Sequence, residues 1–315
     1  MGGAALTAMI KNLDELLRAA AGAKTRRALV VSPANDETFA AIREARERLG
    51  LQFILVGDGK IIERALPDRA GTEIVHRPAV QDCLAASAER LASGEAGILM
   101  KGSIDTATLI KAALRPEAGL RTGRLLSDAF VFEYASQREN KLVMITDGGL
   151  NIAPDLEDKV QLIRNAVEVA HALRNANPKV AVLAATELVQ ENMPATVDAA
   201  ALSQMSERGQ IPGCVVYGPL ALDNALDPHA AREKRIASPV AGAAEILLCP
   251  NIECANALAK STTYIGHARL AHVIVGARIP ILIPSRADTS DAKLLSLALG
   301  MIMSARGELA APEVR

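Results

Sequence analysis

Short apolar runs alternate with longer amphipathic segments along most of the chain. In the first third the apolar runs fall at residues 27–31, 53–56, 74–75 and 97–101. Helical spacing of apolar residues is found at 6–22, 36–49 and 80–92. Short apolar strands that alternate with helices of about 10–15 residues are typical of βαβ units and a parallel sheet.

The alternation breaks once. The apolar runs 126–133 and 141–146 are separated only by the polar loop 136–140. Such a connection is too short for a crossover helix, so the sequence predicts an antiparallel pair. We place a domain junction here. The first domain is expected to comprise residues 1–139 plus 289–315, and the second domain residues 140–288.

After the break the alternation resumes. The predicted strands are 180–183, 214–217, 245–249, 272–275 and 279–284. The predicted helices are 155–174, 193–206, 221–235, 252–264 and 289–305. The pattern predicts an α/β fold of two α/β/α domains, with the last helix returning to the first domain.

Composition narrows the choice of partners. Half of the 315 residues are hydrophobic, but only 2% are aromatic, which indicates a core of Ala, Val, Ile and Leu. Lys and Arg number 35 against 36 Asp and Glu, so neither a basic face nor stacking aromatics favours nucleic acid. With no signal-like N-terminus and no apolar run of spanning length, we expect a soluble cytoplasmic protein without a membrane partner.

The four cysteines form no C-x-x-C motif and cluster with no histidine, so neither a disulfide framework nor a zinc site is predicted. Cys83, Cys214 and Cys249 lie in apolar surroundings and are interpreted as small core residues. Core packing is also favoured for Cys254, with a place in a cleft as the alternative.

One stretch concentrates polar chemistry. Residues 281–291 predict a buried strand that stops at Pro284 and a helix that begins near Thr289. Such a turn directs backbone N–H groups and a helix N-terminus at one point, which suits an anion. The same turn carries a hydroxyl, a cation and two carboxylates, namely Ser285, Arg286, Asp288 and Asp291. An ordinary N-cap with an acidic first turn is the alternative interpretation.

Further polar groups follow other predicted strands, where open α/β sheets bind ligands. Lys101 can hold phosphate, and Gly102 would let a ligand approach the backbone, although Asp105 or Thr106 alone would be a helix cap. The later members of the set are Arg121, Thr122, Asp147, Asn151, Asp223, Ser238, Asn251 and Lys260. Repetition of such groups in phase with the strand ends indicates a binding site.

Several well-known catalytic motifs are absent. The chain has no G-x-G-x-x-G after its first strand, no G-x-x-x-x-G-K-[ST], no G-x-S-x-G and no H-E-x-x-H. Its five histidines are scattered, so no histidine base is favoured. The remaining cations, hydroxyls, amides and carboxylates suit phosphate binding with one carboxylate base and no metal.

Taken together, these segments resemble the phosphate acetyl/butyryltransferase family over residues 27–306. The resemblance rests on residues 100–106, 120–123, 145–155, 193–200, 218–225, 238–242, 250–253 and 285–288. Residues 100–106 and 218–225 are closer to the butyryl branch than to the acetyl branch.

The resemblance implies a fold like that of isocitrate and isopropylmalate dehydrogenases, a homodimer, and an active-site cleft between the two domains. It implies the reaction of acyl-CoA with inorganic phosphate to give acyl phosphate and CoA, with CoA as a substrate and no permanently bound cofactor. The CoA thiolate would attack the acyl phosphate directly, and the acyl group would be short, such as butyryl or acetyl.

By the same resemblance, Ser285 and Arg286 would stabilise the thiolate and the carbonyl oxyanion, and a nearby aspartate would accept the thiol proton. The acetyl branch predicts that base seven residues after the serine, where this chain has Ala292. Asp291 is one position earlier, which is a rotation of about 100° on a helix. Asp291 and Asp288 are therefore both candidate bases.

Three alternative functions remain open. The first is a decarboxylating dehydrogenase on the same fold, which requires a divalent metal and an NAD site. The second is a non-catalytic relative that binds CoA or phosphate, which Ala292 makes plausible. The third is a transferase of a different acyl group.

Overall fold

The computed structural model of the chain describes residues 8–23, 27–135 and 140–310, with side chains up to Arg306. It divides into two compact units. Unit 1 comprises Met1–Leu13 and Leu125–Leu270, and unit 2 comprises Asp14–Arg124 and Ala271–Arg315.

This division differs from the junctions expected after residues 139 and 288. Strand β5 (Ser127–Ala135) pairs with β6 (Asn140–Thr146) and therefore stays with unit 1. Strand β11 (Ile281–Leu282) pairs with β4 (Ala96–Lys101) and stays with unit 2. Strand pairing, rather than the break in the alternation of strands and helices along the sequence, decides which segments belong to the same unit.

Unit 2 contains a mixed sheet. Its strand order is β3 (Thr72–His76), β2 (Phe53–Gly57), β1 (Arg27–Val31), β4, β11 and β10 (Leu270–Val275). The first five are parallel, and β10 is antiparallel to β11. In the β11–β4 pair Ile281 lies opposite Leu99 and Leu282 opposite Met100. The last strand of the chain thus ends beside Lys101.

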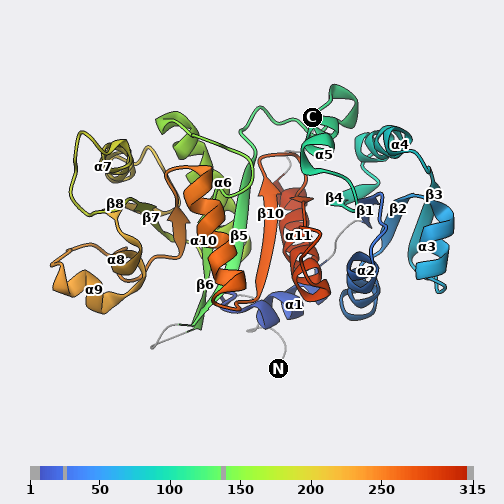
Figure 1. Cartoon of the computed structure of the whole chain (residues 1–315), viewed down its shortest axis with the longest axis horizontal. Coiled ribbons are helices and arrows are strands. Elements are labelled where there is room, and N and C mark those ends of the chain that lie inside the picture. Colours follow the sequence, from blue (N-terminus) through green and yellow to red (C-terminus); the bar gives the residue numbers. More distant parts are fainter. Residues whose placement is uncertain (1–7, 24–26, 136–139, 311–315) are drawn as a thin grey trace. The chain divides into compact units, whose positions relative to one another are not determined.

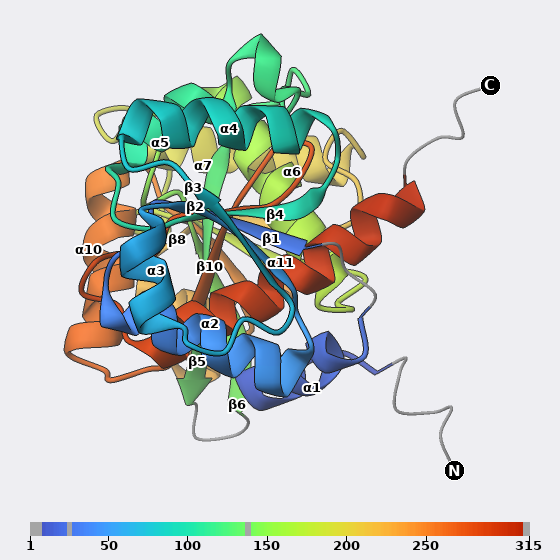
Figure 2. The same ribbon diagram turned by 90° about the vertical axis from the view of Figure 1, so that its right-hand side faces the viewer.

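Helices cover both faces of this sheet. Figures 1 and 2 show α4 (Val80–Ala92) and α5 (Thr106–Ala113) on one face, and α2 (Asp36–Leu49) and α11 (Ser290–Ala310) on the other. Helix α11 packs against α2 and β4. Two further helices are α1 (Leu13–Ala21) and α3 (Gly59–Ala65). The β1 and β2 strands between these layers are almost wholly buried, as their apolar runs predicted.

In unit 1 the strand order is β5, β6, β9 (Ile246–Leu248), β7 (Lys179–Leu183) and β8 (Val215–Leu220). The predicted antiparallel β5–β6 pair is confirmed, and the remaining pairs are parallel. Most of the predicted loop 136–140 lies outside the described residues. The helices are α6 (Leu156–Ala172), α7 (Pro194–Glu207), α8 (Leu222–Leu226), α9 (Pro228–Glu233) and α10 (Ile252–Tyr264).

The α/β class is confirmed, two helical predictions need correction, and one helix was missed. The single helix expected at 221–235 is wrong, because Asp227 caps a new helix by accepting from the His229 N–H at 2.8 Å and Pro228 follows as its first residue. Helix α3 was not predicted. The opening helix begins only at Leu13, and residues 6 and 7 of its predicted range 6–22 lie outside the described residues.

A buried ion pair joins two helices of unit 1. Lys159 on α6 is 5% exposed, and its Nζ lies 2.5 Å from Asp198 Oδ2 on α7. Because a buried ammonium is costly without a counter-charge, Asp198 fixes the approach of α7 to α6.

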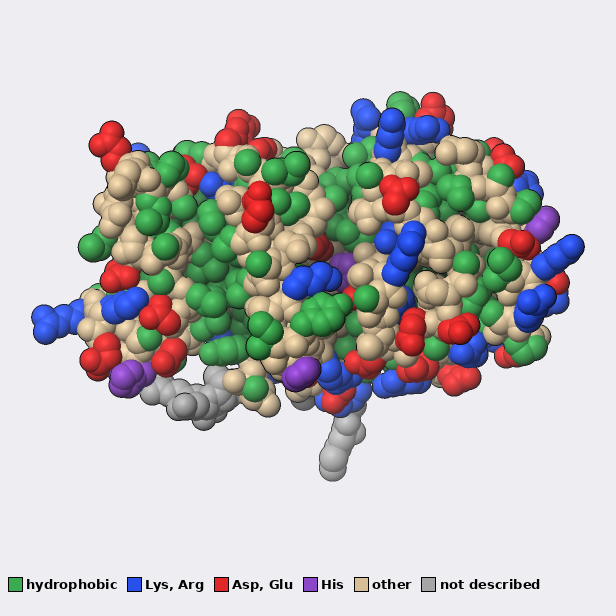
Figure 3. Space-filling view, viewed as in Figure 1, with side chains coloured by type: hydrophobic (Ala, Val, Ile, Leu, Met, Phe, Trp, Pro, Cys, Tyr) green, Lys and Arg blue, Asp and Glu red, His purple; other side chains and the backbone are tan. Residues whose placement is uncertain are grey.

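On the face drawn in Figure 3, acidic and basic side chains are interspersed. This distribution agrees with the formal net charge of −1. No helix within the described residues is long and apolar enough to cross a membrane.

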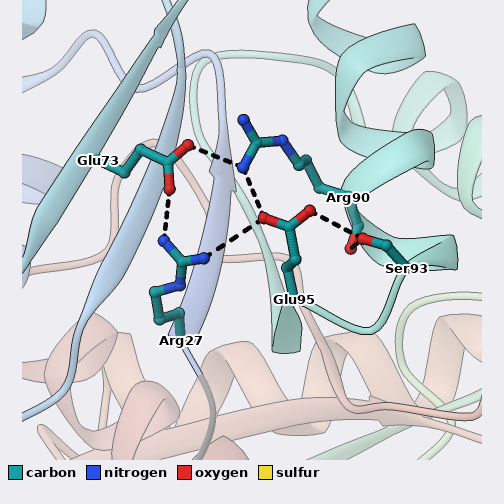
Figure 4. A network of polar contacts seen from close by, with 5 residues as sticks. All are labelled: Arg27, Glu73, Arg90, Ser93 and Glu95. Carbon is teal, nitrogen blue, oxygen red and sulfur yellow. Dashed lines mark hydrogen bonds and ion pairs between the residues drawn. The ribbon is translucent and has the colours of Figure 1, made fainter.

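Strand ends in unit 2 are joined by a charged network (Figure 4). Arg27 Nη1 on β1 lies 2.5 Å from Glu73 Oε2 on β3, and its Nη2 lies 3.4 Å from Glu95 Oε2 before β4. Arg90 Nη1 on α4 contacts both carboxylates, at 2.7 Å to Glu73 and 2.6 Å to Glu95. The Ser93 hydroxyl donates to Glu95 Oε1 at 2.9 Å. A closed network of partly exposed charges costs less side-chain entropy per contact than isolated pairs.

We expect Glu73→Gln to lower the free energy of unfolding at neutral pH more than at acidic pH. The hydrogen bond from Arg27 is the main cause that lowers the pKa of Glu73 below its usual 4.5. A carboxyl whose folded pKa is lowered adds stability above the unfolded pKa, and that stability is lost as pH falls through the folded pKa. Urea unfolding should therefore show the loss at about pH 7 and a smaller loss below about pH 4.

The control is Glu44→Gln, which breaks an exposed i,i+4 pair with Arg48 and should cost no more than about 0.5 kcal/mol. An equal loss for Glu73→Gln at both pH values would contradict the assignment.

Candidate active site

The carboxyl ends of β4 and β11 bring several predicted site residues together in unit 2. Because Leu282 lies opposite Met100, the turn after β11 is placed next to Lys101. That turn contains Ser285, Arg286 and Asp288, and α11 begins directly after it with Asp291 in its first turn. Residues almost 200 positions apart in the sequence thus share one edge of the sheet.

Lys101 is a buried cation at this edge. It is 6% exposed, and no carboxylate in the described part of the chain lies within ion-pair distance of it. Burial is the main cause that lowers the pKa of Lys101, and repulsion from the Arg286 guanidinium adds to it, against attraction from Asp288 and Asp105. Two neighbouring cations, one of them buried, favour the binding of an anion between them.

The turn itself is held by Asp288. Its Oδ2 accepts the Ser285 N–H at 2.7 Å and lies 3.7 Å from His272 Nε2 on β10. The buried Lys293 of α11 donates its Nζ proton to the Asp288 carbonyl oxygen. These contacts fix the backbone that presents the Ser285 hydroxyl and the exposed Arg286 side chain.

The amide groups expected to bind an anion at the start of α11 are used within the chain. The Ser290 N–H donates to Glu37 Oε2 at 2.6 Å, and the Ala292 N–H donates to Thr289 Oγ1 at 3.2 Å. The Ala287 N–H has Ser285 Oγ as its acceptor at 3.4 Å. The predicted capping function is therefore present, and these three amides already have acceptors within the chain.

Gly102 has a steric reason in the fold itself. A β-carbon at Gly102 would lie 2.4 Å from the Ser32 carbonyl oxygen and 2.6 Å from that of Val31. The neighbouring strand end thus excludes a side chain here, and the approach of a ligand to the Gly102 backbone stays a prediction. Asp105 is the N-cap of α5 and accepts the Thr108 N–H at 2.8 Å, as the alternative interpretation stated.

The predicted cationic loop is bound to its own unit. Arg121 Nε donates to the Leu114 carbonyl, and the Thr122 hydroxyl donates to the Gly276 carbonyl. In the described contacts neither residue touches Lys101 or the Ser285 turn. Both stay predicted substrate ligands.

A second polar cluster lies in unit 1, after β6. Asp147 is 3% exposed, and its Oδ1 accepts the Gly149 and Leu150 N–H groups at 2.8 and 3.0 Å. Asn151 Nδ2 donates to Asp147 Oδ2 at 2.5 Å and to the Leu126 carbonyl at 2.8 Å. Burial, followed by the charge of Asp128, raises the pKa of Asp147 to about 6. Because the Asp147 side chain accepts these three hydrogen bonds, it fixes the conformation of the loop that follows β6.

The start of α10 adjoins the same loop. Strands β6 and β9 are parallel neighbours, and the Ile252 N–H donates to the Ile152 carbonyl at 3.0 Å. Asn256 Nδ2 donates to the Gly148 carbonyl at 2.9 Å. Asn251 is the N-cap of α10 and accepts the Cys254 N–H at 3.0 Å. Asp147, Asn151 and Asn251 are thus brought together.

The other predicted ligands of unit 1 lie apart from that cluster in the described contacts. Asp223 forms an exposed ion pair with Lys234 at 3.2 Å. Ser238 Oγ accepts the Val240 N–H at 3.2 Å within its own loop. Lys260 is exposed, with its Nζ 6.0 Å from the Tyr264 ring centre.

Three residues of these clusters were not predicted. Lys293 is the only lysine in the apolar stretch 292–303, which is a signal that sequence reasoning could have used. His272 and Asp128 lie within strands and are recognised only through their neighbours. The interpretation of Cys254 as a core residue is wrong, because its side chain is exposed.

Comparison with known proteins identifies relatives over nearly the whole chain. The sequence profile of a family described as "Phosphate acetyl/butaryl transferase" matches residues 18–301. The probable phosphate butyryltransferase of Bacillus subtilis is 42% identical, over 93% of this chain and 98% of its own length. The phosphate acetyltransferase of Thermotoga maritima is 39% identical, over 93% of this chain and 99% of its own.

Solved structures of phosphotransacylases also match this chain. A branched-chain phosphotransacylase from Enterococcus faecalis matches with a TM-score of 0.79 and 31% identity, over 88% of this chain and 99% of its own. A phosphotransacetylase from Streptococcus pyogenes matches with a TM-score of 0.75 at 18% identity, over 93% and 98% of the two chains, and shows the likeness of fold alone. The likeness to isocitrate dehydrogenases stays a prediction.

We expect the Asp147 carboxyl to titrate near pH 6 and to do so at lower pH in Asp128→Asn. Burial opposes ionisation in both proteins, so only the part of the shift caused by the Asp128 charge should disappear. Carbon-13 NMR of the aspartate carboxyl groups measures both midpoints, and Asp223→Asn should leave the Asp147 midpoint unchanged. Identical midpoints in the wild type and Asp128→Asn would show that the two carboxylates do not interact.

Proposed function

The chain belongs to the phosphate acetyl/butyryl transferase family, and from this membership we propose how it acts. It is an acyltransferase that moves an acyl group between CoA and inorganic phosphate. The acyl group is short, such as butyryl or acetyl. No metal or permanently bound cofactor takes part.

The cationic edge of unit 2 is the observation that supports this reaction most. Lys101 and Arg286 provide positive charge beside the Ser285 hydroxyl, and Lys101 is buried without a carboxylate partner among the described residues. Phosphate, acyl phosphate and the carbonyl oxyanion of the transition state are all anions that such groups stabilise. We assign phosphate binding to Lys101 and Arg286, and oxyanion stabilisation to Arg286 and Ser285.

The chemical step is a direct displacement. The CoA thiolate attacks the carbonyl carbon of the acyl phosphate, the C–S bond forms, and the C–O bond to phosphate breaks with its electron pair leaving on phosphate. The reverse reaction uses a phosphate oxygen as the nucleophile and the thiolate as the leaving group. A thiol with a pKa of about 8.5 needs a base or a cation to react at neutral pH. In this site an aspartate would be the base and Arg286 the cation.

Asp291 is the proposed base, and Asp288 is a positioning residue. The Asp288 side chain is 12% exposed and already accepts the Ser285 N–H beside His272, so its contacts support the turn. Asp291 is half-buried in the first turn of α11. The neighbouring Ala292, which occupies the position expected for the base, is buried and offers no proton acceptor in its side chain.

The polar residues of unit 1 remain predicted ligands of the substrates. Asp147, Asn151 and Asn251 form one cluster, whereas Asp223, Ser238 and Lys260 lie outside it in the described contacts. The homodimer, the cytoplasmic location and the placement of the active site between two domains also stay predictions.

We expect Arg286→Ala to lower phosphate-dependent release of CoA from butyryl-CoA by about 100-fold or more, because it removes a charged donor to the oxyanion. Arg286→Lys keeps the charge but not the two-pronged donor and should recover part of the rate. The control is Arg64→Ala on the exposed surface of α3, which should match the wild type. Assays with and without EDTA test the rival metal-dependent dehydrogenase. Phosphate-independent release, or equal rates in Arg286→Ala and wild type, would refute the assignment.

The two aspartates should differ in what their loss affects. Asp291→Asn is expected to reduce kcat much more than thermal stability, because it removes a proton acceptor while the contacts of Asp288 with the turn stay in place. Asp288→Asn should lower both stability and activity, because it weakens the contacts of Ser285 and His272. Steady-state kinetics and thermal unfolding of each variant separate these effects. A full loss of kcat in Asp288→Asn at unchanged stability would instead make Asp288 the base.

A further inference from the structure

Lys293 is a buried cation in the first turns of α11. It is 1% exposed, and Leu294 and Leu295, which follow it, are fully buried. Its Nζ donates to the Asp288 carbonyl oxygen, and no carboxylate in the described part of the chain lies within ion-pair distance of it. A neutral acceptor, rather than an opposite charge, therefore compensates this ammonium group.

Such an arrangement lowers stability. Lys159, which is 5% exposed, shows the usual alternative, because its Nζ lies 2.5 Å from the Asp198 carboxylate. Burial is the main cause that lowers the pKa of Lys293, and attraction to Asp288 and Glu37 does not cancel it. A lysine that binds its proton less tightly in the folded than in the unfolded chain disfavours folding while it is charged. Stability alone therefore does not account for a lysine at position 293.

The contact of Lys293 leads to the turn that carries Ser285 and Arg286. Two hydrogen bonds close this turn. The Ser285 N–H donates to Asp288 Oδ2 at 2.7 Å, and the Asp288 N–H donates to the Ser285 carbonyl oxygen at 3.2 Å. The third polar group of Asp288, its carbonyl, is the one that accepts from Lys293. Because α11 packs against β4 and α2, the lysine ties the closed turn to a helix held by the core of unit 2.

We propose that Lys293 is a positioning residue for acyl transfer, which anchors the Asp288 carbonyl to α11 and so holds the turn that presents the Ser285 hydroxyl and the Arg286 guanidinium. The inference rests on the proposed function, because these two groups are assigned there to the oxyanion. Lys293 acts through the backbone of Asp288 and not by contact with the substrate. Its charge is kept for the reaction, although it lowers the stability of the fold.

An ammonium group suits this anchor better than a neutral donor. A charged donor forms a stronger hydrogen bond to a carbonyl oxygen than a neutral one, and the flexible lysine stem can reach back along the helix from position 293 to position 288. A displacement of about 1 Å in a catalytic group can lower a rate by about 100-fold. Loss of the anchor is therefore expected to affect the reaction without unfolding the chain.

Lys293→Met is the central test, because methionine is unbranched, apolar and able to fill the same space. We expect kcat for phosphate-dependent release of CoA from butyryl-CoA to fall about ten-fold or more. The melting temperature should equal or exceed that of the wild type, because the substitution removes a buried charge and leaves only a neutral carbonyl without its donor. The KM for phosphate should change less than kcat, since Lys101 and Arg286 are still present.

The stability control is Asp198→Asn, which leaves the buried Lys159 without its carboxylate. It should show the opposite pattern, with a lower melting temperature and an unchanged kcat below that temperature. Lys293→Gln keeps an N–H donor without the charge, so it should recover part of the kcat lost in Lys293→Met. It also provides a second variant if Lys293→Met does not fold.

Hydrogen exchange of the peptide that covers residues 285–288 gives a measurement that does not depend on activity. Exchange there should be faster in Lys293→Met than in the wild type, and unchanged in Asp198→Asn. If the wild type releases no CoA in response to phosphate, the proposed function fails, and the exchange rates still decide whether Lys293 holds the turn.

Three results would overturn the positioning role. The first is an unchanged kcat in Lys293→Met. The second is a fall in kcat together with a fall in melting temperature, which would indicate a structural role. The third is exchange in the turn as slow as in the wild type. Equal kcat values in Lys293→Gln and Lys293→Met would show that the hydrogen bond to the Asp288 carbonyl is not what supports the reaction, and would overturn the proposal as well.

Discussion

The parallel pairing of β11 with β4 is the constraint on which the chemistry of unit 2 depends. Leu282 lies opposite Met100, so the chain must end its last strand beside Lys101 and turn there into α11. A shift of this register by one residue would reverse which side chains face the core, and it would move Ser285 and Arg286 away from Lys101. Burial of both strands and the packing of α11 on β4 hold the register. The site is thus positioned by a core rather than by a free loop.

At the carboxyl ends of β4 and β11, some polar groups hold the turn in place and others are proposed to bind substrate. Backbone amides of the turn and of the α11 N-terminus are satisfied by Asp288, Thr289 and Glu37, which rigidifies the segment. Lys101 and Arg286 repel each other electrostatically, and an anion bound beside them, as proposed for phosphate, would relieve this repulsion. Asp147 in unit 1 shows a related arrangement. Its buried carboxylate organises the loop after β6 by accepting hydrogen bonds from two backbone N–H groups of that loop and from the Asn151 side chain.

Periodicity predicted most of the secondary structure, because most strands have an apolar centre and long helices such as α2, α6 and α10 carry side-chain N-caps. Helices α2, α4 and α10 have the predicted bounds. Helix α3 is only one to two turns long, too short to show a period, and Pro228 divides a stretch whose apolar pattern is continuous. Residue types also identified the turns that carry polar side chains, but not the residues that these side chains contact. The steric reason for Gly102 is a carbonyl oxygen beside a neighbouring strand end, which local sequence spacing does not encode.

Family membership and the cationic edge of unit 2 together make one central claim, that phosphate accepts the acyl group of a CoA thioester. The most direct measurement incubates the purified chain with butyryl-CoA and phosphate labelled with heavy oxygen, and quantifies free CoA and acyl phosphate by mass spectrometry. The account predicts equal amounts of the two products, with labelled oxygen bridging the acyl carbon and phosphorus. Free butyrate in place of acyl phosphate, or no release of CoA from butyryl- or acetyl-CoA, would contradict it.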